Sequence, residues 1–141
     1  MPPAAAARIA ARDPPYPFAA AQAVAAAAFW TVLAARAEVV DIVWGHEGRF
    51  ARSLNIAPGE FVEHCGLLEA GASLQWRFEA DPPLDFNIHF HLGKDIRYPA
   101  RADQARQANG TLAANAARQY CWMWTHNAAA AASVRVDLER R

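Results

Sequence analysis

The sequence lacks an excess of either charge, which argues against nucleic acid as its partner. Its 141 residues contain 14 Lys and Arg against 14 Asp and Glu, so the formal net charge at pH 7 is zero. A domain that binds nucleic acid normally carries a clear basic surplus. The chain is also short for two domains, and we expect one.

Motifs of common catalytic sites are absent as well. The chain has no Gly-x-Ser-x-Gly, His-Glu-x-x-His, Walker or Gly-x-Gly-x-x-Gly pattern. Its carboxylates lie scattered near predicted turns and at outward-facing positions, where they are normally solvated, and no two form a pair for acid–base catalysis. We therefore expect that the protein is not an enzyme. The carboxylates considered are Glu60, Glu63, Glu69, Glu79, Asp81, Asp85 and Asp95.

Alanine is abundant, with 35 of the 141 residues, and it crowds the first forty positions. Arg8 and Arg12 precede an uncharged apolar run, Phe18–Ala35, which closes on the small-x-small pattern Ala35-Arg36-Ala37. A positive flank, an apolar stretch and a small-residue site in this order are typical of a secretory signal peptide. The sequence therefore predicts a leader over residues 1–37 and export to the periplasm or the cell exterior.

Two other interpretations of this segment stay open. It could be an uncleaved membrane anchor, although an anchor normally needs about 20 strongly apolar residues. It could also be an alanine-rich hydrophobic helix packed on a cytosolic domain. With cleavage, residues 38–141 form the mature domain, whose 11 basic and 13 acidic residues give a net charge of −2. This part has no second apolar run long enough to span a membrane.

From Glu38 onward, apolar and polar residues alternate with a period of two, which is typical of strands with one buried face. Gly- and Pro-containing turns separate the alternating segments. We expect an all-β fold, an antiparallel, jelly-roll-like β-sandwich of about eight strands, with a long polar connection over 100–110 and a loop over 128–132. The expected strands are 39–44, 50–56, 61–67, 74–80, 84–92, 96–98, 120–125 and 134–138.

The chain has two cysteines, Cys65 and Cys121, both in the predicted mature domain. An even number of cysteines in a small exported protein favours a disulfide over free thiols. The segment around the second cysteine is aromatic: Tyr120, Trp122 and Trp124 share one face of a strand. We expect these rings in the core of the sandwich, and a ligand-stacking platform is the alternative.

The pattern from Cys65 to Leu138 resembles the GOLD domain, the luminal β-sandwich of the Golgi-dynamics cargo-receptor family. Its elements are Cys65 with Gly71, the strand Leu74–Phe78, the strand Phe86–His91 before the turn Gly93-Lys94-Asp95, and the aromatic strand Tyr120–Asn127. Relative to the family, the two cysteines are shifted by about two residues in opposite directions, which keeps them opposite each other and on the same face. The resemblance thus implies a sandwich and a Cys65–Cys121 disulfide. It does not carry over the cargo-receptor role, because fold does not settle function.

His89 and His91 are the sharpest candidates for a site. Two histidines at i and i+2 on a strand share a face and can bind one Zn²⁺ or Cu²⁺, with His126 assisting from a strand that could lie beside theirs. A cupredoxin-like site with Cys121 as ligand needs a thiolate there and lacks an axial methionine after His126. The plainer interpretation is a solvated polar sheet face.

Two functions follow from these observations. The first is a non-catalytic, exported, GOLD-like β-sandwich without a cofactor that binds a protein or an envelope component. The alternative is a periplasmic protein that binds copper or zinc through His89 and His91.

Overall fold

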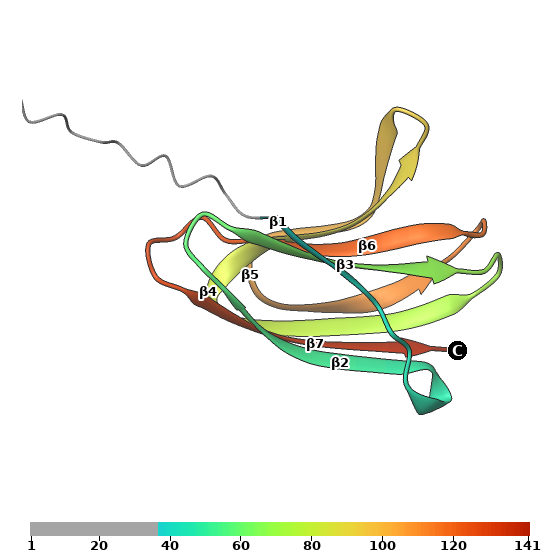
Figure 1. Cartoon of the computed structure of the whole chain (residues 1–141), viewed down its shortest axis with the longest axis horizontal. Helices are drawn as coiled ribbons and strands as arrows, with labels where there is room; N and C mark the ends of the chain where they lie inside the picture. The colour runs from blue at the N-terminus through green and yellow to red at the C-terminus, as the bar shows by residue number, and fades with distance from the viewer. Residues whose placement is uncertain (1–36) are drawn as a thin grey trace, which may run out of the picture. The chain divides into compact units, whose positions relative to one another are not determined.

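The computed structural model describes residues 37–141, which are almost entirely β-strand (Figure 1). The predicted leader and alanine-rich helix fall outside this range, apart from Ala37. Within the described range, no helix is long and apolar enough to cross a membrane. The elements are β1 (Ala37–Asp41), the 3-10 turn η1 (His46–Gly48), β2 (Arg49–Ile56), β3 (Phe61–Leu68), β4 (Ser73–Leu92), β5 (Asp95–Ala113), β6 (Arg118–Thr125) and β7 (Ala132–Arg140).

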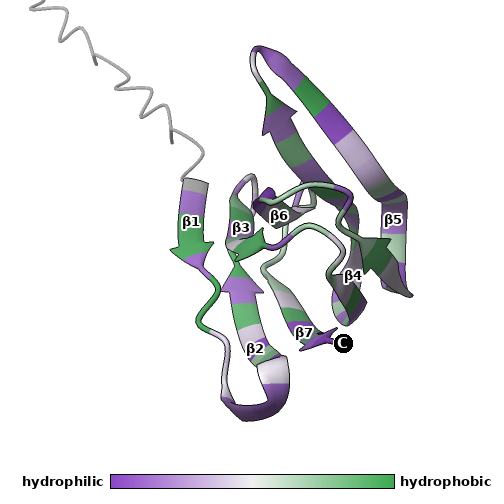
Figure 2. Ribbon diagram, turned by 90° about the vertical axis from the view of Figure 1, so that its right-hand side faces the viewer, coloured by the Kyte–Doolittle hydropathy of each residue, from purple (hydrophilic) through white to green (hydrophobic). Residues whose placement is uncertain are grey.

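The predicted alternation defines the two faces of the strands, as the bands of hydrophobic and hydrophilic residues in Figure 2 show. Along the first half of β4, Leu74, Trp76 and Phe78 are buried, whereas Gln75 and Arg77 between them are exposed. β7 repeats this pattern, with burial alternating from Ala132 to Leu138. The expected all-β fold is confirmed.

The long strand β4 organises the sheet. The strand order is β1-β3-β6-β4-β7-β2, with β5 also paired to β4. The first half of β4 pairs with β7 and the second half with β6, so the sheet curls into two layers. The two separate strands predicted at 74–80 and 84–92 are thus one bent strand. Pro82 and Pro83 mark the bend, because they donate no backbone hydrogen bonds and the pairing with β5 is interrupted between Glu79 and Leu84.

The predicted polar connection over 100–110 is wrong, because this segment belongs to β5 and pairs with β4. Its inward-facing positions are alanines, which escaped notice as core residues because they are small. They are half-buried and pack against the core: Ala100, Ala102, Ala105 and Ala108. The predicted loop over 128–132 is right except that Ala132 already begins β7.

The sequence predicted a purely antiparallel sheet, and this prediction is wrong for one pair of strands. β1 runs parallel to β3, with Ala37 opposite Phe61 and Asp41 opposite Cys65. The reason is the connection between them. The intervening strand β2 pairs with β7 at the other end of the strand order, so β1 and β3 do not form a hairpin.

Aromatic side chains fill the space between the layers. Trp124 and Trp122 are fully buried and Tyr120 is 1% exposed, so the aromatic strand lies in the core and is not a ligand platform. The ring of Phe86 lies 5.5 Å from that of Trp124 and 4.6 Å from that of Phe78. Burial of such large rings is the main stabilising contribution to a domain of this size.

Candidate functional site

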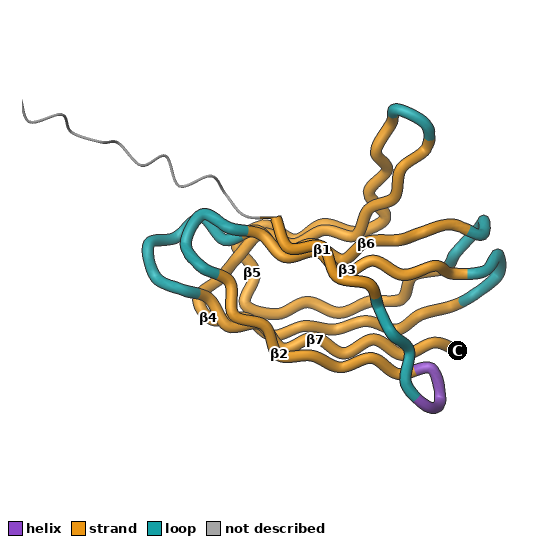
Figure 3. The backbone as a smooth tube through the Cα atoms, in the orientation of Figure 1, coloured by secondary structure: helices purple, strands orange, loops and turns teal. Residues whose placement is uncertain are grey.

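The hairpin between β4 and β5 projects from the sheet (Figures 1 and 3). β4 pairs with β6 as far as His89, which is opposite Cys121. Beyond His89, the residues of β4 pair with β5. We call residues 90–98 the arm. Its tip turns at Gly93, whose φ of 63° is favourable for glycine and costly for other residues.

Apolar side chains are exposed on this arm. Leu92 is 50% exposed, Ile96 44% and Tyr98 43%. They are half of the large hydrophobic residues that are exposed in the described part of the chain; the others are Val39, Val43 and Leu67. Scattered apolar residues are ordinary on a surface, but three on one projecting hairpin form a candidate contact site.

The arm and its base are also basic. Lys94 and Arg97 lie on the arm with Asp95, which pairs with Arg97 at 3.3 Å. Arg101 follows at the base, and its guanidinium lies 3.7 Å from the centre of the Tyr98 ring. Cation–π contact of this kind orients the ring and keeps a positive charge beside it. The arm therefore combines apolar side chains with a positive surplus, with Ile96 on one face of the hairpin and Leu92 and Arg97 on the other.

A second cluster lies at the base of the arm, where three strands meet. Cys65 on β3 is opposite Cys121 on β6, which is in turn opposite His89 on β4. The two cysteines form a disulfide with an S–S distance of 2.11 Å. Glu63 completes the cluster: its Oε1 accepts a hydrogen bond from Nε2 of His89 at 2.9 Å and lies 3.5 Å from Sγ of Cys65.

The structure brings together some of the predicted metal ligands and separates others. The rings of His89 and His91 are 5.6 Å apart, as their spacing predicts. His126 follows Thr125, which is opposite Asp85, so it lies roughly 15 Å along the sheet from His89. His126 is fully buried, and its Nε2 is hydrogen-bonded to the carbonyl oxygen of Ala130. The predicted three-histidine set is therefore not assembled in one place.

The interpretation of the β4 histidines as a solvated face holds for His91, which is exposed, and is wrong for His89, which is 6% exposed. His89 is covered because the disulfide, Glu63 and Tyr98 surround it. Glu63, expected from the sequence to be solvated, is its partner. The available signal was that Glu63 precedes Cys65 by two residues and so shares its face.

Burial lowers the pKa of His89, because a desolvated imidazolium is unfavourable. The carboxylate of Glu63 acts in the opposite direction, and His91 adds to the lowering. Burial also lowers the pKa of His64, whose ring lies against Phe50 in the core, with Glu38 opposing this effect.

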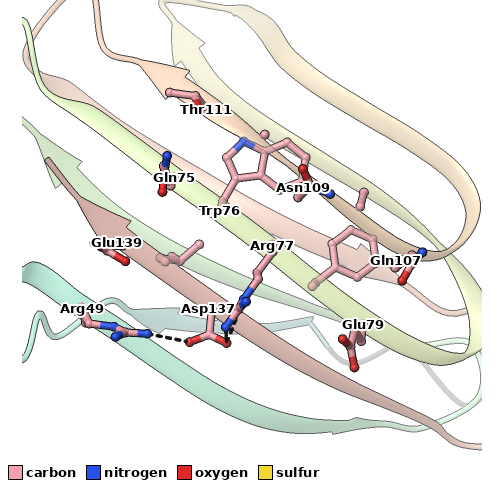
Figure 4. A pocket seen from close by; sticks show the side chains of 14 residues that line it. Arg49, Gln75, Trp76, Arg77, Glu79, Gln107, Asn109, Thr111, Asp137 and Glu139 are labelled. Carbon is pink, nitrogen blue, oxygen red and sulfur yellow. Dashed lines mark hydrogen bonds and ion pairs between the residues drawn. The ribbon is translucent and has the colours of Figure 1, made fainter.

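A polar groove of about 630 Å³ lies on the outer face of β4, β5 and β7 (Figure 4). Asp137 stands at one side of it, accepting hydrogen bonds from Arg77 at 3.1 Å and pairing with Arg49 at 3.8 Å. Amides and further carboxylates also line it, beside the ring of Trp76: Gln75, Glu79, Gln107, Asn109 and Glu139. Most of these polar groups are exposed on an open sheet, and their arrangement indicates a solvated face.

No family model and no curated protein matches the chain. Among solved structures, the periplasmic inhibitor of g-type lysozyme, PliG, from Aeromonas hydrophila is similar, with a TM-score of 0.62 and 14% identity. The alignment covers 77% of this chain and 100% of that one. PliG from Salmonella Typhimurium has a TM-score of 0.51 and 14% identity, with 74% of this chain and 98% of that one covered. The likeness is one of fold. It supports the β-sandwich, whereas the resemblance to GOLD domains stays a prediction.

Proposed function

We propose that this chain is a non-catalytic, exported β-domain that binds another protein through its arm. The single observation that carries the proposal is the exposure of Leu92, Ile96 and Tyr98 on one projecting hairpin. A few anchor residues, among which Trp, Tyr and Arg are enriched, contribute most of the free energy at protein interfaces. An envelope component is the other partner class predicted from the sequence.

The charges on and beside the arm indicate which class of protein could bind it. Lys94 and Arg97 on the arm, with Arg101 at its base, outnumber Asp95, so this part of the molecule suits a cleft that carries carboxylates. Glycoside hydrolases have such clefts, because their catalytic groups are carboxylic acids. The fold shared with PliG supports the same class, since those structures are inhibitors of g-type lysozyme. A g-type lysozyme is therefore the first partner to test.

The test measures binding to a purified g-type lysozyme by calorimetry and, in parallel, the rate of cell-wall lysis. We expect binding that slows lysis and weakens as ionic strength rises, because the arm is basic. Replacing Leu92, Ile96 and Tyr98 together by serine should weaken binding by about 30-fold or more, the effect of losing one strong anchor.

A matched control is available within the same domain. Replacing Val39, Val43 and Leu67 by serine removes three exposed apolar side chains that are not part of the arm and should leave affinity unchanged. Equal weakening by the two triple variants would refute the arm as the binding surface. Absence of any binding by the parent chain would refute the choice of lysozyme.

Export is tested separately, by producing the full chain in a Gram-negative bacterium and sequencing the N-terminus of the periplasmic product. We expect the mature protein to begin at Glu38. Recovery of the chain from the cytosol with residues 1–37 intact would contradict export.

A further inference from the structure

The cluster of Glu63, His89 and the disulfide contains the side chains of a candidate metal site, but its two sulfur atoms are bonded to each other. One ligand atom from each of Glu63, His89 and Cys121 lies within 4.8 Å of the others. A tetrahedral Zn²⁺ ion with bonds of about 2.0 to 2.3 Å separates its ligands by roughly 3.5 Å, so small side-chain shifts would bring these donors onto one ion. Sγ of Cys65, 3.5 Å from the Glu63 carboxylate, supplies a fourth donor.

The disulfide withholds the strongest of these donors. A thiolate binds zinc, whereas a sulfur atom in a disulfide has no charge to offer. We propose that reduction of the Cys65–Cys121 disulfide turns this cluster into a zinc site with Glu63, His89 and Cys121 as ligands and Cys65 as the fourth. The disulfide and the metal are then mutually exclusive states of one place in the fold.

The reductant is a dithiol. Its thiolate attacks one sulfur of the disulfide, the S–S bond breaks, and a mixed disulfide forms. Its second thiol then displaces the cysteine and closes the dithiol's own disulfide. The two electrons and two protons end on Cys65 and Cys121 as thiols, and zinc replaces the thiol protons when it binds.

The surroundings of His89 fit this role. Its Nδ1 lies 2.8 Å from Oδ1 of Asn87. With a proton on Nδ1 donated to Asn87, a metal can replace the proton on Nε2, which already points at the Glu63 carboxylate. Metal-binding histidines commonly have such a partner on the second nitrogen, which fixes the ring and its tautomer.

Burial separates this site from adventitious surface binding. Cys65 is 4% exposed, Cys121 5% and His89 6%. His91 is exposed and lies outside the cluster, although its ring is next to that of His89. It therefore provides a matched control, since a loosely bound ion would prefer the accessible histidine.

The experiment is equilibrium dialysis of the full chain against Zn²⁺ alone, with the oxidised protein beside protein reduced by dithiothreitol and freed of reductant under anaerobic conditions. We expect about one tightly held Zn²⁺ per reduced chain and at least tenfold less uptake by the oxidised chain. Cobalt replacing zinc should give a thiolate charge-transfer band in the reduced form alone.

Variants identify the ligands. In the reduced state, Glu63→Gln, His89→Ala and Cys121→Ser should each weaken zinc binding at least tenfold, whereas His91→Ala should leave it unchanged. Equal uptake by the oxidised and reduced chains, or sensitivity to His91→Ala with indifference to His89→Ala, overturns the proposal. So does a reduced chain that binds no zinc.

The sulfurs are nearly buried, so a reductant has poor access to the disulfide. The variant Cys65→Ser avoids this difficulty, because it leaves Cys121 as a free thiol without any reductant. If this variant or the reduced chain loses its β-sheet circular dichroism, restoration of that signal by zinc supports the site. Loss of the sheet that zinc does not restore counts against it, since the ligands meet only in the folded sheet.

Discussion

A methyl group added to Gly110 would test the packing between β5 and β4 directly. Gly110 is opposite Trp76 in the paired strands, and a Cβ atom placed on it would lie 2.7 Å from Cζ2 and 3.0 Å from Cε2 of the indole. Carbon atoms do not approach so closely without displacement. Trp76 is 9% exposed, and its ring lies 5.1 Å from that of Phe86, which limits movement of the indole on that side.

Two effects of Gly110→Ala oppose each other. Alanine in a strand interior makes the folded state more stable than glycine does by about 0.5 to 1 kcal/mol, because an unfolded chain with alanine has less conformational freedom to lose on folding. Overpacking a filled site costs about 1 to 3 kcal/mol. We expect the clash to dominate and the free energy of unfolding to fall by about 1 to 2 kcal/mol. In a domain of this size, this lowers the melting temperature by roughly 4 to 8 °C for each kcal/mol.

The assay is urea denaturation followed by circular dichroism, applied to a double-mutant cycle with Trp76→Phe. Phenylalanine lacks the indole atoms that meet the new methyl group, so Gly110→Ala should cost little or become favourable in that background. Asn109→Ala, on the exposed side of the same strand, is the control and should be within about 0.5 kcal/mol of the parent. A stabilising Gly110→Ala, or the same cost in both backgrounds, would refute the contact.

The remaining predictions concern the disulfide and the two buried histidines. Cys65→Ala with Cys121→Ala opens a loop between residues 56 apart and should lower the free energy of unfolding by ~4 kcal/mol in the chain-entropy treatment; a loss below about 1 kcal/mol in urea denaturation would contradict it. In the oxidised, metal-free chain, burial holds the pKa of His64 and of His89 below the usual value of 6.5. The unfolded chain then binds more protons as pH falls below about 6.5, so stability should be constant above this pH and decline below it, toward the folded pKa values. Urea midpoints measured between pH 7.5 and 5.5 follow this decline in stability, and His64→Phe should make the decline smaller. An unchanged dependence of the midpoint on pH in that variant would exclude His64 as a source of the decline.

Strand formation and the assignment of faces could be predicted from the sequence because both depend on neighbouring residues. Alternation along the chain places Trp76 inward and Arg77 outward before any partner strand is known. The same local rule put His89 and His91 on one face. It failed for β5, whose inward positions are alanines such as Ala102 and Ala105, too small to register as a buried pattern.

The candidate site depends on contacts between residues far apart in the chain. Alternation alone could not show that His89 is opposite Cys121, or that Glu63 reaches it across β6. Nor could it show where a projecting arm begins, since this depends on β6 ceasing to pair with β4 at His89. These features follow from strand order and register, which long-range packing selects.

Side-chain order along the chain is enough to predict an all-β domain, the inward and outward faces of most strands, and an aromatic core, because each of these follows from a period of two along a strand. Contacts between distant strands are needed to establish the parallel pairing of β1 with β3, the bend that makes β4 a member of both layers, and the burial of His89 beside Glu63 and the disulfide. The physical reason is that the free energy of pairing distant strands depends on the whole core that they enclose, and no short segment contains that information.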